Sequence, residues 1–225
     1  MSANPQRLPL PVAEGLAAKI RRRLEPGCER IEAAGSLRRR CPSVGDLEFV
    51  VIPRGGDDRD LFGNAASGRT ALDLILDQLR AERRLLPLVN GPKQKRFELT
   101  AFAGLTLELY LVQPEAWGVQ LMIRTGPAEF SHRMVTHRRA RGLMPDTHRI
   151  YQGRLYRTAY AHAPHAVPIN DRRYELIPTP EESDLFEAMG LPDIPPRQRQ
   201  RLADWRVPVA AAARPQIPAS EGPVG

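Results

Sequence analysis

Apolar residues recur every three or four positions in several parts of the chain, which is the spacing of one helix face. Near the start, this spacing predicts a helix over residues 12–24 that Pro26-Gly27 ends. Four further helices are predicted, over residues 72–86, 115–124, 128–141 and 181–189. Pro127 precedes the helix predicted over residues 128–141, where its missing N–H costs nothing, and Gly190 closes the helix predicted over residues 181–189.

Shorter apolar runs between turn residues predict strands over residues 30–34, 46–52, 97–102 and 105–112. A hairpin is predicted around Gln152-Gly153. The order of elements favours an α+β fold with a small, mostly antiparallel or mixed sheet and flanking helices, followed by a small α/β lobe. We divide the chain into a flexible N-terminus (1–6), a first domain (7–125), a second domain (126–206) and a disordered tail (207–225), the last from its Ala, Pro and Gly content.

Charge and cysteine content indicate the type of partner and the compartment of the protein. The 225 residues include 33 Lys and Arg against 26 Asp and Glu, a net charge of +7, which favours a polyanionic partner. The two cysteines, Cys28 and Cys41, form no CxxC pair and suggest reduced thiols. The chain shows no signal peptide and no apolar run of membrane-spanning length, so we expect a soluble, cytoplasmic monomer.

Three acidic residues suggest a metal site. Asp46 and Glu48 stand two positions apart on a predicted strand and therefore point to the same face. Glu108 is a lone carboxylate inside another apolar strand. Because like charges on one face repel each other and hard divalent ions prefer carboxylate oxygens, the three predict a cage for two Mg²⁺ ions.

The residues just before this strand suit a triphosphate. Glycines such as Gly35 and Gly45 let backbone amides approach phosphate oxygens, while the Ser36 hydroxyl and the Arg39 guanidinium supply further donors. A phosphate-binding turn followed by paired carboxylates is typical of a nucleotidyltransferase. The sequence therefore predicts catalysis of nucleotidyl transfer by positioning and electrostatic stabilisation.

The stretch Gly35-Ser36-Leu37-Arg38-Arg39 with Gly45-Asp46-Leu47-Glu48 resembles the palm motif of the X-family DNA polymerases, the group that contains DNA polymerase beta. Four further stretches agree in order: Arg7-Leu8-Pro9, Leu107-Glu108-Leu109, Thr125-Gly126, and the thumb signature at Leu185–Pro192 with Ile194-Pro195-Pro196. The resemblance implies a palm domain followed by a thumb-like domain. It also implies a DNA polymerase that adds dNMP from a dNTP to a primer 3′-hydroxyl, in short-gap filling, repair or replication.

The resemblance also implies roles for single residues. Asp46, Glu48 and Glu108 would be catalytic and bind Mg²⁺ or Mn²⁺, with Glu108 nearest the primer 3′-hydroxyl. The nucleotide would contact Arg7, Gly35, Ser36, Arg39, Gly45, Thr125 and Gly126. DNA, as a primer-template or gapped duplex, would contact Lys93, Lys95, Arg133, Arg138, Arg139 and Arg141, with Arg197, Arg199 and Arg201 as further candidates. No segment here matches the family's N-terminal lyase and finger regions, so we expect palm and thumb alone to hold the DNA.

Several positions depart from the family pattern. Glu48 and Glu108 replace aspartates, and Ile123-Arg124 replaces two aromatic residues that bear on sugar discrimination. Ser131 stands where an asparagine often contacts the base minor groove, and Val135 where an arginine often contacts the template. Two alternatives therefore stay open: a template-independent nucleotidyltransferase, and a non-catalytic DNA-binding module with a degenerate palm.

Overall fold

The structure, a computed structural model, describes residues 7–55, 69–158 and 171–204. The expected flexible N-terminus (1–6) and disordered tail (207–225) lie entirely outside the described residues. The fold is mixed α/β with small sheets, which agrees with the predicted class.

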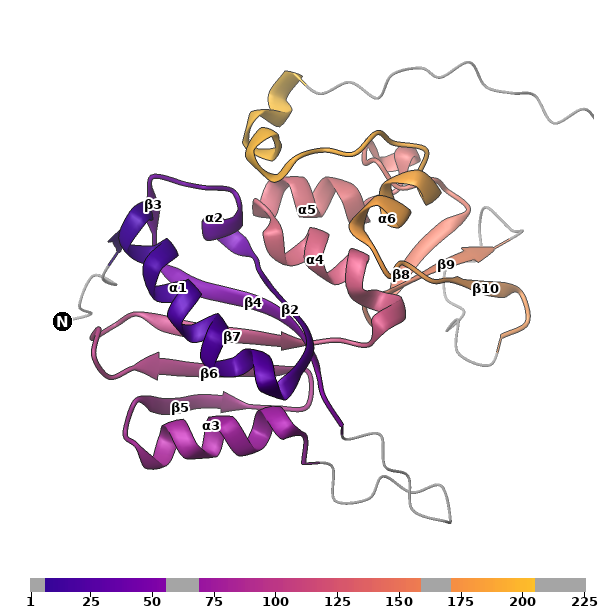
Figure 1. Cartoon of the computed structure of the whole chain (residues 1–225). Helices are drawn as coiled ribbons and strands as arrows, with labels where there is room; N and C mark the ends of the chain where they lie inside the picture. The colour runs from indigo at the N-terminus through magenta and orange to yellow at the C-terminus, as the bar shows by residue number, and fades with distance from the viewer. Residues whose placement is uncertain (1–6, 56–68, 159–170, 205–225) are drawn as a thin grey trace, which may run out of the picture.

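The largest sheet has five strands in the order β2 (Cys28–Ala33), β4 (Asp46–Pro53), β7 (Thr106–Leu111), β6 (Gln94–Leu99) and β5 (Leu85–Asn90) (Figure 1). The strands β4 and β7 run parallel, and the other neighbours are antiparallel. In the parallel register Glu48 lies opposite Glu108. A short pair, β1 (Leu8–Pro9) with β3 (Ser43–Val44), holds the start of the described chain beside the turn that precedes β4.

Each face of this sheet has its own helical cover. The helices α1 (Leu10–Leu24) and α3 (Ala71–Ala81) bury their apolar sides against Phe49, Leu107 and neighbouring residues in one hydrophobic cluster. A 3-10 turn, η1 (Glu25–Gly27), follows α1, and a capping box formed by Thr70 and Asp73 starts α3. On the other face, α4 (Trp117–Thr125), which follows η2 (Pro114–Ala116), packs against the C-terminal halves of β4 and β7.

A second lobe has its own core, separate from the sheet. It contains α5 (Ala128–Val135), η3 (Arg138–Ala140), α6 (Glu182–Ala188), η4 (Pro196–Asp204) and an antiparallel sheet of β8 (His148–Tyr151), β9 (Arg154–Thr158) and β10 (Tyr174–Ile177). Gln152 and Gly153 both have positive φ, 48° and 80°, as the predicted two-residue hairpin requires. Because α4 contributes to this core and to the sheet cover, the expected boundary at residue 125 falls at the end of a shared helix.

Two predicted helices end well before their expected C-termini. The one over residues 72–86 ends at Ala81, and Leu85 begins β5, a strand that the sequence pattern did not reveal. The basic helix over residues 128–141 ends at Val135, because the Thr136 hydroxyl bonds the His132 carbonyl oxygen and the backbone of Thr136 is extended. The strand β10 was also not predicted. None of the helices within the described ranges is long and apolar enough to cross a membrane.

Candidate active site

The predicted phosphate-binding turn forms a short helix, α2 (Gly35–Arg38), between β2 and β3. Gly35 has φ of 58°, and a Cβ at this position would lie 1.7 Å from Glu48 Oε2, so only glycine allows this approach of turn and carboxylate. The side-chain atoms Ser36 Oγ and Arg39 Nε are buried without a hydrogen-bond partner among the described residues. Such unpaired polar atoms suit a ligand with oxygen atoms.

The other nucleotide candidates converge on this turn. Arg39 donates a hydrogen bond to the backbone oxygen of Thr125, at the C-terminus of α4. The guanidinium of Arg7 donates hydrogen bonds to the Ser43 hydroxyl, at 2.9 Å, and to the Ser43 backbone oxygen, at 3.0 Å. A Cβ on Gly45 would lie 2.9 Å from Arg7 Nη1, which places this arginine beside the loop that leads into β4.

Asp46, Glu48 and Glu108 project from neighbouring strands toward the same face of the sheet. Burial and the negative charge of Glu108 raise the pKa of Asp46 above its usual range. Burial, followed by the charges of Asp46 and Glu108, raises the pKa of Glu48 to about 7. The neighbouring negative charges therefore oppose the ionisation of Asp46 and Glu48, an electrostatic cost that a divalent cation would remove.

Glu108 is held by three donors. Its Oε1 lies 3.0 Å from Arg96 Nε, and its Oε2 accepts hydrogen bonds from the Tyr110 hydroxyl at 2.6 Å and from Gln94 Nε2 at 3.3 Å. Within residues 7–55, 69–158 and 171–204, no three acidic, histidine or cysteine side chains lie close enough together to hold a metal ion. The chemical type of the donors fits Mg²⁺ or Mn²⁺, and Glu108 must leave some of these partners to join such a site.

Two residues that the sequence reasoning missed adjoin the carboxylates. Besides its bond to Glu108, the Tyr110 hydroxyl lies 3.5 Å from Glu48 Oε1. The guanidinium carbon of Arg124 lies 3.8 Å from the centre of the Tyr110 ring, and this positive charge lowers the pKa of Glu48 against the other influences. The alternation of side chains along a strand was the available signal, since residue 110 shares a face with residue 108.

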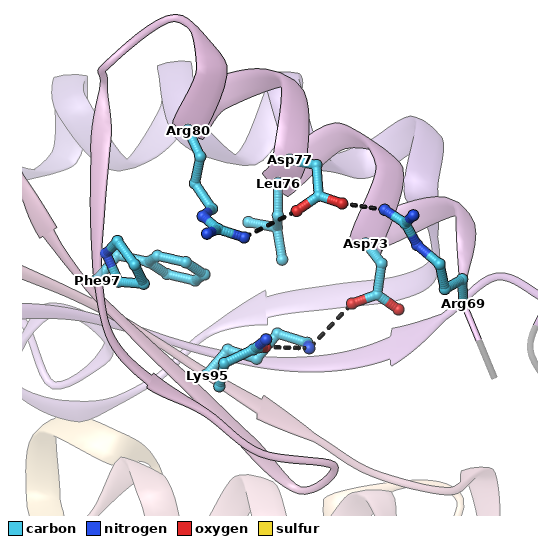
Figure 2. A pocket seen from close by; sticks show the side chains of 9 residues that line it. Arg69, Asp73, Leu76, Asp77, Arg80, Lys95 and Phe97 are labelled. Atoms are coloured by element: carbon cyan, nitrogen blue, oxygen red, sulfur yellow. Dashed lines mark hydrogen bonds and ion pairs between the residues drawn. The ribbon is translucent and has the colours of Figure 1, made fainter. Parts of the chain in front are cut away.

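The two lysine candidates for DNA contact have different surroundings. Lys93 is exposed in the turn between β5 and β6. Lys95 is buried, with Nζ 2.9 Å from Asp73 Oδ1 and 2.7 Å from Asn90 Oδ1, and it lines a cavity of about 730 Å³ between α3 and the sheet (Figure 2). It points to the face of β6 opposite Arg96, away from the carboxylates. Lys95 thus forms an ion pair that joins β6 to α3, an arrangement that does not support its expected DNA contact.

The basic residues of the second lobe do not form one helical stripe. Arg133 lies on α5, Arg138 and Arg139 lie in η3, and Arg141 follows it with φ of 63°. Arg138 donates hydrogen bonds to the backbone oxygens of Leu143 and Met189, so it also has a structural role.

Among the C-terminal arginines, Arg197 is exposed. Arg199 is only 1% exposed and lies 2.8 Å from Glu182 Oε1, over the rings of Phe130 and Phe186. Arg199 is therefore engaged inside the second lobe, which does not support the suggestion that it contacts DNA. The side chain of Arg201 lies outside the described part of the chain.

Comparison with known proteins tests the resemblance that the sequence motifs predict. Residues 120–200 match the family described as DNA polymerase beta thumb, a range that holds Thr125-Gly126, the hairpin and α6. DNA polymerase lambda of Rattus norvegicus is 24% identical to this chain over 179 residues, which are 77% of this chain. The resemblance to X-family DNA polymerases is confirmed. The matched region spans 28% of the length of that relative.

Proposed function

We propose that this protein is a nucleotidyltransferase that adds dNMP from a dNTP to the 3′-hydroxyl of a DNA primer, in short-gap filling or repair synthesis. The observation that carries the proposal is the contact between the Gly35 turn and Glu48. It brings a turn with unpaired polar atoms, Ser36 Oγ and Arg39 Nε, against the carboxylates of β4. Phosphate donors and metal ligands next to each other are what nucleotidyl transfer requires.

In this proposal the residues divide the work by position. Ser36 and Arg39, with Arg7 beside them, bind the outer phosphates of the dNTP. The backbone at Thr125-Gly126, already bonded to Arg39, borders the sugar. Asp46, Glu48 and Glu108 hold the divalent cations, which neutralise phosphate charge and lower the pKa of the attacking hydroxyl when bound.

DNA binding is proposed from the charge distribution and the family resemblance. The chain carries a net charge of +7, and the exposed Lys93, Arg139 and Arg141 remain candidates for phosphate contacts. Such contacts position a duplex without reading its sequence, as a primer-extending enzyme needs.

A template-independent nucleotidyltransferase is the second candidate, and one contact favours it. The Ser131 hydroxyl donates a hydrogen bond to the backbone oxygen of Ile123 at 2.9 Å. It is thus engaged within the protein, at a position where the resembling family often contacts the base minor groove. The third candidate is a non-catalytic DNA-binding module. Two observations support it: glutamates stand at two positions where the resembling family has aspartates, and three donors already hold the Glu108 carboxylate.

One assay separates the three candidates. The full chain is incubated with a labelled gapped duplex, each dNTP singly, and either Mg²⁺ or Mn²⁺. Incorporation that follows the template base supports the polymerase, addition of any nucleotide supports template-independent transfer, and binding without incorporation supports the third candidate. Asp46→Asn must abolish incorporation, whereas Asp77→Asn, on α3 and paired with Arg80, must not. Incorporation that survives Asp46→Asn would refute the assignment of the metal site.

A further inference from the structure

The Tyr110 hydroxyl bridges two carboxylates that would otherwise repel each other. Tyr110 follows Glu108 by two positions on β7, so both side chains lie on the same face of the sheet. Its hydroxyl donates a hydrogen bond to Glu108 Oε2 at 2.6 Å and lies 3.5 Å from Glu48 Oε1. With Tyr110 only 6% exposed, water does not readily replace this hydroxyl.

Arg124 holds the tyrosine ring from the other side. Its guanidinium carbon lies 3.8 Å from the ring centre, and its Nε is buried without a hydrogen-bond partner among the described residues. Arg124 belongs to α4 and directly precedes Thr125, which Arg39 contacts. The position of the Tyr110 ring therefore depends on the same helix that borders the proposed nucleotide site.

A divalent cation at this site would meet the tyrosine hydroxyl at Glu108, because Oε2 of this carboxylate already accepts a short hydrogen bond from it. A divalent cation binds carboxylate oxygens directly, and a short hydrogen bond from a phenol occupies one of them. Arg96 also contacts Glu108, but its side chain is 44% exposed and can move into solvent. The buried and stacked Tyr110 is the more persistent competitor.

We propose that Tyr110 is a positioning residue that competes with the divalent cation for Glu108 and so sets the metal affinity of the site. This inference rests on the proposed metal site at Asp46, Glu48 and Glu108. The hydroxyl holds the Glu108 side chain through the 2.6 Å hydrogen bond, and a cation that takes up Oε2 would have to displace it. Arg124 keeps the ring in place in both states, so the competition is built into the fold.

The test is Tyr110→Phe, which removes the hydroxyl and keeps the ring under Arg124. Titration calorimetry with Mn²⁺ on the full chain should show binding about tenfold tighter than in the unsubstituted protein, because a hydrogen bond to a charged group is lost only from the metal-free state. Tyr151→Phe is the matched control. Its hydroxyl contacts the Gln152 amide at 3.4 Å, in the hairpin of the second lobe, and it should leave Mn²⁺ affinity unchanged.

A second comparison ties the effect to Glu108. In the background of Glu108→Gln, the further change Tyr110→Phe should leave Mn²⁺ affinity unaltered, since the competition no longer exists. Addition of Mn²⁺ to the unsubstituted protein should also change the ultraviolet difference spectrum of tyrosine, and Tyr110→Phe should abolish that change. The spectral change of the unsubstituted protein is measured on the native chain and therefore does not depend on the folding of a variant.

The outcomes separate the inference from the function on which it rests. Equal or weaker Mn²⁺ binding by Tyr110→Phe, or an unchanged tyrosine spectrum, would overturn the competition while leaving the metal site standing. Absence of Mn²⁺ binding by the unsubstituted protein, together with absence of incorporation, would overturn both.

Discussion

The raised pKa of Glu48 makes a quantitative prediction about stability. Burial and the charges of Asp46 and Glu108 raise this pKa from 4.5 to about 7. The folded protein therefore holds a proton on Glu48 in a pH range where the unfolded chain has released it. Stability from this group is fully present below about pH 4.5 and is lost as the pH rises through about 7.

The magnitude follows from the size of the pKa difference. At 1.36 kcal/mol for each pH unit, the rise corresponds to about 3 kcal/mol of unfavourable free energy in the folded state at alkaline pH. Glu48→Gln removes the ionisable group and keeps its size. Without divalent cations, the variant should therefore unfold with a free energy about 2–3 kcal/mol higher than the original protein at pH ~8.5, and with almost no difference at pH ~4.

Urea unfolding followed by circular dichroism, in the presence of a chelator, measures this difference. Glu175→Gln on β10, an exposed acid with no resolved contact to the site, is the control and should leave the stability unchanged at both pH values. Mg²⁺ or Mn²⁺ should stabilise the original protein more than Glu48→Gln, since the cation relieves the repulsion that the variant lacks. An equal stability difference at both pH values, or none at alkaline pH, would refute the account of the carboxylates.

Three further predictions test other parts of the structure. Gly35→Ala should abolish incorporation and lower the free energy of unfolding by about 1–2 kcal/mol, because the added methyl group would lie 1.7 Å from a carboxylate oxygen. Gly15→Ala on α1 is the control: a Cβ there meets nothing within 4 Å, so this variant should stabilise the protein by about 0.5–1 kcal/mol. Lys95→Met removes the ion pair with Asp73, so it should destabilise the protein in urea titrations by about 1–3 kcal/mol and leave DNA affinity, measured by fluorescence anisotropy, unchanged. Lys93→Met should instead weaken DNA binding without a change in stability. Glu182→Gln should cost about 3–5 kcal/mol in the same titrations, since it leaves a buried arginine without its counter-charge, and a loss below 1 kcal/mol would contradict the importance of that ion pair.

Sequence periodicity predicts the elements whose local pattern fits one type of secondary structure. It misses a segment whose local pattern fits a helix although long-range pairing makes it a strand. The helix α1 and the hairpin at Gln152-Gly153 follow directly from apolar spacing and turn chemistry. The leucines of β5 continue the apolar pattern of α3 and so predict the end of a helix, and only pairing with β6 makes this segment a strand. Long-range pairing of this kind is not encoded in local spacing.

The candidate site shows the same division. Motif spacing and strand alternation predict that Asp46, Glu48 and Glu108 share one face of the sheet, and the register of β4 and β7 places them so. The same reasoning assigned Lys95 and Arg199 to a nucleic-acid surface, although both are buried in ion pairs with acids far away in the sequence. Charge alone does not tell an exposed cation from a paired one, since the partner comes from tertiary structure.

The contacts of Arg38 and Arg39 explain how the two lobes can be coupled at the proposed nucleotide site. Arg39 bonds the backbone of Thr125, while Arg38 bonds the Thr125 hydroxyl at 2.8 Å and Glu182 at 2.9 Å. Glu182 in turn pairs with Arg199 inside the second core. Buried ion pairs add little net stability but strongly penalise any arrangement that separates their members. A phosphate that draws Arg39 from Thr125 would therefore act on α4, and through α4 on Arg124 and the Tyr110 ring stacked beneath it.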